Sequence, residues 1–208
     1  MTQRAEQFKA ELIERVAGQA VSRLGRERGA PVEGFIRRFY ANVAPDDLRG
    51  ATVDDLFGAA LSLWSFGLQR PPGAAKVRVY NPRLEDHGWH SHQTVIEAVN
   101  DDMPFLVDSV IAALNRRDLT VHLVIHPILR VERDAAGRLV AAEAGRPESY
   151  IQVWIGEQSA PGLLEALRGD LEKVLADVRA AVEDWRTMRA KIGEIVAELD
   201  REPPPLPA

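Results

Sequence analysis

The sequence predicts an α+β fold in which an antiparallel sheet follows an N-terminal helical segment and precedes a long C-terminal helix. Apolar residues recur every three or four positions in residues 1–75 and again after residue 163, which is helical spacing. Between these regions, β-branched residues gather in short runs bounded by turn residues, as in strands. The 208 residues are 46% hydrophobic and 27% charged. This composition is that of a folded chain of one or two domains, and not of a disordered one.

Residues 1–75 are predicted to be helical. The first apolar stripe ends before the turn residues Gly25 and Gly29, and a second stripe occupies residues 32–40. Thr52 is a good N-cap for the next helix, because Asp55 stands three residues later as in a capping box. That helix is expected to end before Arg70-Pro71-Pro72-Gly73. The first stripe consists of Phe8, Leu12, Ile13, Val16, Ala20 and Leu24.

Residues 76–185 are predicted to form the α+β domain. The element order is strand, strand, helix, strand, strand, helix, which is a split β-α-β pattern of the ferredoxin-like, βαββαβ type. We expect four largely antiparallel strands with both helices on one face of the sheet. The segment 119–131 is apolar at nearly every position, which predicts one long strand buried at least in part on both faces. The expected elements are strands 76–80, 94–99, 119–131 and 149–155 and helices 105–117 and 164–199, with a hairpin loop at 134–138.

The C-terminal apolar stripe is too long to be buried in one small domain. Residues 186–208 are therefore predicted to be a helix extension followed by a proline-rich linker to further domains. The far half of the stripe is our candidate for a contact with another domain or subunit. We expect the whole stripe to be a packing seam and not a cofactor site. The candidate interface residues are Trp185, Met188, Ile192, Ile195 and Leu199.

Composition and motifs argue against several classes of protein. The net charge of −5 is unlike that of a general nucleic-acid binder, and the absence of cysteine excludes disulfides and thiol catalysis. No apolar run is long enough for a membrane span and no secretory signal opens the chain, so we expect a cytoplasmic protein without nucleic-acid or membrane partners. No Gly-x-Gly-x-x-Gly or phosphate-loop motif is present. We therefore expect no catalytic residue and no bound cofactor in this chain.

The turn at residues 100–106 is the candidate ligand site, because it joins a strand to a helix N-terminus, where free N–H groups can receive a carboxylate. Asp101 and Asp102, with Asp108 nearby, could instead cap the helix or hold a cation, and capping is the simpler interpretation. The candidate ligand-binding residues are Asp101, Asp102, Met103, Pro104, Phe105, Leu106 and Val107.

The histidines raise the question of a metal. His90 and His92 would share one face of an extended segment, and Asp86 could add an oxygen ligand. We interpret residues 86–92 as a polar loop, with a small metal-dependent enzyme as the competing hypothesis. His122 and His126 would lie about 13 Å apart on a strand, too far for one metal. We therefore expect no metal site.

Several collinear stretches of the chain resemble the N-terminal region of the large NAD-dependent glutamate dehydrogenases of bacteria. They are residues 59–64, 99–110, 122–129, 148–150, 174–182, and Asp184-Trp185 with Met188. The resemblance implies a non-catalytic, ACT-like segment of a much longer chain that binds NAD in a downstream domain. The full enzyme would oxidise L-glutamate to 2-oxoglutarate and ammonia.

The resemblance also implies an amino-acid effector at the turn and assembly of the chain into a homo-oligomer. The downstream domains of the same chain would be further partners of this segment. In amino-acid-binding ACT modules the turn typically reads Asp-x-Pro-Gly, whereas this chain has Asp102-Met103-Pro104-Phe105. Phenylalanine in place of glycine is expected to crowd the approach of a ligand. A regulatory and assembly segment is our first hypothesis, and a free-standing ACT-like amino-acid sensor is the alternative.

Overall fold

The computed structural model of the chain describes residues 2–202 as an α+β structure with a six-stranded antiparallel sheet. In chain order its elements are α1 (Thr2–Ala41), the 3-10 helix η1 (Pro45–Leu48), α2 (Val53–Gly67), β1 (Lys76–Tyr80), α3 (Leu84–His87), β2 (Gln93–Asp101), α4 (Leu106–Asn115), β3 (Val121–Ile125), β4 (Ile128–Arg133), β5 (Leu139–Ala142), β6 (Arg146–Gly156) and α5 (Leu163–Arg201).

The sheet is built around β6. Its order is β1-β2-β6-β4-β5, and β3 also pairs with β6. Because β2 and β3 are both antiparallel to β6 and lie on either side of it, they run parallel to each other and α4 connects them. This is the split β-α-β unit expected from the order of elements. The expectation of four strands is wrong: β5 was not foreseen, and the segment 119–131 contains two strands.

The break between β3 and β4 lies at His126-Pro127. Ile125 is paired with Gln152 and Ile128 with Ser149, so the register along β6 is the same on both sides of this break. Pro127 has no N–H for a ladder bond, and its carbonyl accepts the N–H of Tyr150 at 3.0 Å. In β4 exposed and buried residues alternate, so the expected burial on both faces does not extend to this strand.

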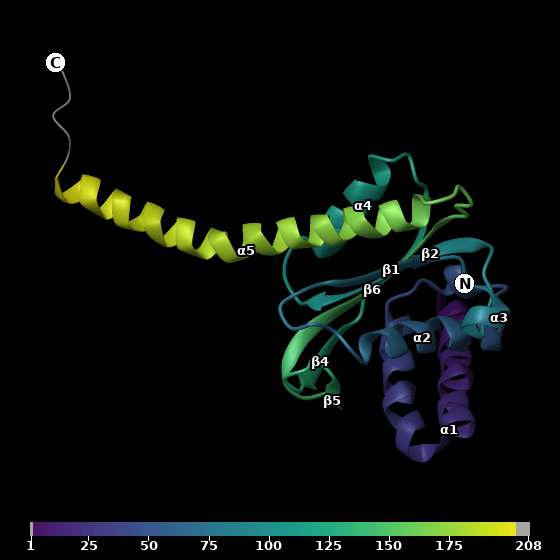
Figure 1. The fold of residues 1–208 in the computed structure, drawn as a ribbon. Helices are drawn as coiled ribbons and strands as arrows, with labels where there is room; N and C mark the ends of the chain where they lie inside the picture. Colours follow the sequence, from purple (N-terminus) through teal and green to yellow (C-terminus); the bar gives the residue numbers. More distant parts are fainter. Residues whose placement is uncertain (1, 203–208) are drawn as a thin grey trace.

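The sheet lies between two helical layers, as Figure 1 shows. Alternate strand residues serve opposite faces: Ile96 and Ala98 pack with α4 and α5, whereas Val99 packs with α1 and α2. Helices α4 and α5 thus share one face, and the N-terminal helices cover the other. The core between the sheet and the N-terminal helices contains both Phe35 of α1 and Tyr150 of β6, whose ring centroids are 5.7 Å apart. The division at 1–75, 76–185 and 186–208 stays a prediction.

Residues 2–41 form two helical arms joined at Gly25, where φ is 77° and ψ 164°. The arms approach closely, since a Cβ on Gly29 would collide with the backbone at Ala20. The expected N-cap of α2 is confirmed: Thr52 Oγ1 accepts the N–H of Asp55 at 3.0 Å and donates to its carboxylate at 2.6 Å.

Candidate functional site

The turn between β2 and α4 is fixed to the start of β6. The Asp102 carboxylate accepts a hydrogen bond from Ser149 Oγ at 2.6 Å, and the Asp102 N–H donates to the carbonyl of Pro147 at 3.1 Å. Phe105 precedes α4 with a φ of 71°, the left-handed conformation that favours glycine. Phe105 is 66% exposed and borders a hollow between α4 and α5.

The aspartates of the turn do not cap α4. The N-cap position is occupied by Phe105 and has no side-chain cap hydrogen bond, while Asp108 lies in the first turn of the helix. The capping interpretation is therefore wrong for Asp101 and Asp102, which bind groups on other elements.

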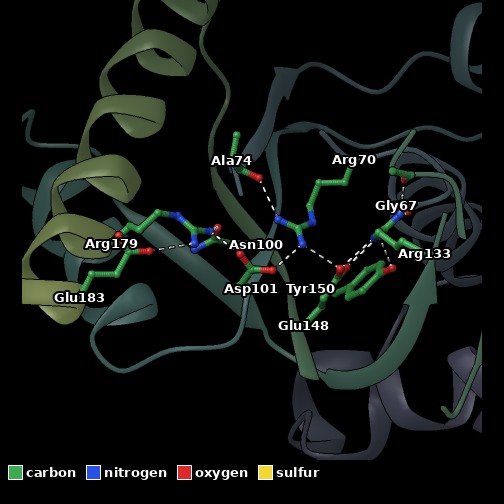
Figure 2. A network of polar contacts seen from close by, with 11 residues as sticks. Gly67, Arg70, Ala74, Asn100, Asp101, Arg133, Glu148, Tyr150, Arg179 and Glu183 are labelled. Carbon is green, nitrogen blue, oxygen red and sulfur yellow. Dashed lines mark hydrogen bonds and ion pairs between the residues drawn. The ribbon is translucent and has the colours of Figure 1, made fainter. Parts of the chain in front are cut away.

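Asp101 and Glu148 hold three arginines in one network, shown in Figure 2. The Asp101 carboxylate accepts from Arg70 at 2.5 Å and from Arg179 of α5 at 2.6 Å. Glu148 accepts from Arg70 at 2.8 Å and from Arg133 of β4 at 2.7 Å. The network thereby joins the segment after α2, the ends of β2 and β6, and α5.

Most of this network is removed from water. The side chains of Arg70 and Glu148 are each 4% exposed and that of Arg133 is 9% exposed. Such charges are tolerated only when they are paired and hydrogen-bonded. Burial raises the pKa of the Asp101 carboxyl, but hydrogen bonds from Arg70 and Arg179 outweigh it, so the pKa lies below its usual value. Burial raises the pKa of Tyr150, whose hydroxyl meets Arg133, to about 12.

A hollow of about 790 Å³ opens beside this network. We call it the arginine hollow. It lies between the 70–73 segment, the hairpin ends of β4 and β6, and α5, and its charged lining includes Arg70, Asp101, Arg133, Arg146, Glu148 and Arg179.

A second buried polar group lies under α2. Glu97 of β2 is fully buried and accepts hydrogen bonds from Tyr80 at 3.0 Å, from Gln152 at 3.1 Å and from Arg78. Gln152 also donates to the carbonyl of Ala59 in α2 at 3.0 Å. Glu97 thus binds side chains of β1 and β6, and Gln152 connects this group to α2, so the group fixes α2 on the sheet.

The distal half of α5 carries an exposed apolar face and projects away from the sheet (Figure 1). The last buried side chain of α5 is Val178, although Arg179 still pairs with Asp101 of β2 and Val182 still packs against the core. From residue 183 onward, every α5 side chain that the structure describes is exposed. The five predicted interface residues lie on this part of the helix, and their exposed fractions range from 45% to 59%. We call them the α5 stripe: Trp185, Met188, Ile192, Ile195 and Leu199. The predicted linker at 203–208 lies outside the described residues.

The histidine-containing segment 86–92 is only partly a loop, because Asp86 and His87 belong to α3, which ends at His87. The rings of His90 and His92 are 4.6 Å apart, and His87 Nδ1 accepts the N–H of Arg83 at 3.1 Å. Within residues 2–202, no three histidine or carboxylate side chains gather as metal ligands would. Nor does any helix in this range have the length and apolarity that a bilayer span requires.

Comparison with known families decides the relationship. The family model described as "Glutamate dehydrogenase, ACT1 domain" matches residues 35–171. The chain belongs to this family.

Two curated relatives extend the match over nearly the whole chain. The NAD-specific glutamate dehydrogenase of Halomonas elongata is 42% identical over 206 residues, which cover 96% of this chain. The enzyme of the same name from Pseudomonas aeruginosa is 33% identical over 207 residues. In both comparisons the chain spans 13% of the relative's length. The expected relationship to the large glutamate dehydrogenases is confirmed.

The ACT1-domain match covers the sheet and follows α5 as far as Leu171, so it ends before the α5 stripe. Of the predicted turn residues, the structure places only Asp101 at the arginine network, and Phe105 lies at the neighbouring hollow. The sequence reasoning did not identify Arg70, Arg133 or Glu148 as one group. A signal was present, because Glu148 directly precedes the predicted strand 149–155, in which five of seven residues are apolar or aromatic.

Proposed function

We propose that this ACT1-family chain is a non-catalytic regulatory and assembly segment of a large, cytoplasmic NAD-dependent glutamate dehydrogenase. The full chain would oxidise L-glutamate to 2-oxoglutarate and ammonia, with NAD held in a downstream catalytic domain. The sheet would be an ACT-type module whose edge beside β2 is filled by β1. The two curated relatives support this assignment through their names and through the small share of their length that the chain spans.

The α5 stripe is the observation that carries the assembly role. Its spacings are three, four, three and four residues, which is the a/d repeat of a coiled coil. The stripe continues the seam that packs against the sheet, where Leu171, Val174 and Val178 have the same spacing. We propose that the α5 stripe binds the α5 stripe of a second copy, and that the downstream domains follow it in each chain.

The charges beside the stripe favour a parallel pair. With Trp185, Ile192 and Leu199 as a positions, Asp184 is a g position and Arg189 is the e position five residues later. In a parallel coiled coil these two positions face each other across the interface, so each copy's Asp184 would meet Arg189 of the other copy. Opposite charges at such positions determine the orientation of the helices more than they add affinity.

Disulfide trapping tests the parallel pair, because the chain has no cysteine of its own. In Ile192→Cys, an a-position residue would face its counterpart in the second copy, so mild oxidation is expected to give a covalent dimer. Ala190→Cys is the matched control, since it lies at the f position on the outer side of the same helical turn. Equal cross-linking of the two variants, or no cross-linking of Ile192→Cys, would contradict the proposal.

An amino-acid effector at the Asp101–Val107 turn is the regulatory part of the proposal. The hollow beside Phe105 is also lined by Arg116 and Asp177, which offer partners for a carboxylate and an ammonium group. A thermal-shift screen against the amino acids tests this part. An amino acid at a hundred times its Kd should raise the Tm by roughly 5–11 °C. A flat result over the whole panel would leave assembly as the role of the segment.

A further inference from the structure

We propose that the arginine hollow binds a small oxyanion, a carboxylate or a phosphate, in a site separate from the turn at Phe105. The proposal goes beyond the assembly role and depends on different residues.

The carboxylates at the centre of the hollow are already occupied. Asp101 lies between Arg70 and Arg179, and Glu148 lies between Arg70 and Arg133. Asp134 Oδ1, at the rim, accepts the N–H groups of Ala136 and Arg138, each at 2.9 Å. Of the four carboxylates that line the hollow, Glu132 alone has no hydrogen-bond or ion-pair partner within residues 2–202. The site is thus poor in free acceptors.

Arginine N–H groups, by contrast, are left over. Arg70 is 4% exposed, and its buried Nε–H has no acceptor among the described residues. Arg146 borders the same hollow and forms no ion pair or hydrogen bond through its side chain within residues 2–202. A buried donor without an acceptor is rare and costly in native proteins. An oxyanion in the hollow would be a counter-charge for Arg146, and one that reached Arg70 would also supply the acceptor that its Nε–H lacks.

The geometry of arginine suits this ligand. Guanidinium groups present a planar fork of N–H donors that matches the oxygens of carboxylate and phosphate. The hollow offers such groups from three separate parts of the chain, namely Arg70, Arg146 of β6 and Arg179 of α5. The Arg179–Asp101 pair connects α5 to the end of the sheet. A bound oxyanion would strengthen this connection.

Isothermal titration of the full chain at low ionic strength tests the site, with inorganic phosphate and malonate as the two probes. Comparison of the probes distinguishes a phosphate site from a carboxylate site. We expect saturable binding of at least one probe with one site per chain. Arg146→Gln should weaken it about tenfold to a hundredfold, because a charge-assisted hydrogen bond is lost. The Arg146 side chain makes no hydrogen bond or ion pair within residues 2–202, so this variant should keep the wild-type Tm.

Arg130→Gln is the matched control. Arg130 is an exposed arginine of the neighbouring strand β4 and does not border the hollow. Its replacement should leave the affinity within about twofold of the wild-type value, since exposed charges contribute little at a distance. Absence of saturable binding for both probes would overturn the proposal. So would an Arg146→Gln variant that binds as wild type, or an equal loss in Arg130→Gln, which would indicate binding to general surface charge.

Discussion

Glu148 is the side chain on which the arginine network depends most. It lies between Arg70 and Arg133, and all three side chains are nearly removed from water. Glu148→Ala would leave the buried Arg133 without a counter-charge and would remove one of the two carboxylates that pair with Arg70. We expect the free energy of unfolding to fall by about 3–5 kcal/mol. Urea denaturation measures this change. Glu132→Ala on the adjacent strand is the control and should stay within about 0.5 kcal/mol of wild type.

Asp101 should make stability depend on pH on the acid side. Its carboxyl has a lowered pKa in the folded chain, because hydrogen bonds from Arg70 and Arg179 outweigh the effect of burial. The stabilisation is therefore complete above the unfolded-state pKa of about 3.9 and is lost as the pH falls through the folded-state pKa.

The comparison variant is Asp101→Asn, studied by urea denaturation between pH 7 and pH 3. The difference in unfolding free energy between wild type and variant should be largest near pH 7 and shrink below about pH 4. A difference that stays constant over this range would show that the Asp101 charge is not what the two arginines stabilise.

Residue-scale prediction from the sequence succeeded where the cause was local and failed where it was not. The Thr52 cap depends on a residue three positions away, and the structure confirms it. The partners of Asp101, in contrast, are 31 and 78 positions away along the chain. No local sequence pattern indicates such a pair, because it forms only when the sheet brings distant elements together. The arginine network was therefore identified from the structure.

Helix α2 approaches the rest of the molecule through glycines. A Cβ on Gly58 would overlap the side chain of Trp89, which is only 1% exposed, and one on Gly67 would overlap Tyr150. Gly58→Ala should therefore lower the free energy of unfolding by about 1–3 kcal/mol through overpacking. Gly169 of α5 has open space around it, so Gly169→Ala should raise that free energy by about 0.5–1 kcal/mol.

Thermal and urea unfolding of these two variants check the packing of α2. Both substitutions add the same methyl group to a helix, so their opposite signs would isolate the close approach at Gly58 from helix propensity. Stabilisation by both substitutions would contradict the tight contact between α2 and Trp89.

The strands show what hydrophobic patterning can and cannot predict. The run 119–131 was apolar enough to indicate a strand, but a register shift between Val121 and Leu123 and the missing N–H of Pro127 interrupt its pairing with β6. Strand β5 escaped prediction because its four residues, Leu139–Ala142, include two alanines and a single β-branched residue. The order of the elements along the chain indicated the split β-α-β unit. It did not indicate at which edge of the sheet β1 pairs, because that depends on contacts between residues far apart in the sequence.

At the scale of the whole molecule, the α5 stripe is an apolar surface that the described residues leave uncovered. Complete burial of a large apolar side chain contributes about 1.5–3 kcal/mol, so burial of half-exposed ones contributes about half of that. Two stripes would together gain roughly 10 kcal/mol, against an association cost of about 4–15 kcal/mol. We therefore expect weak self-association, with a Kd in the micromolar range or above.

Sedimentation equilibrium over a wide range of protein concentration tests the assembly role most directly. The account predicts a mass that rises from one chain towards two as the concentration increases. Ile192→Glu should abolish this rise by placing a charge in the seam, while Ala190→Glu on the outer side of the same turn should preserve it. A wild-type chain that keeps the mass of one copy up to its solubility limit would contradict pairing through the α5 stripe.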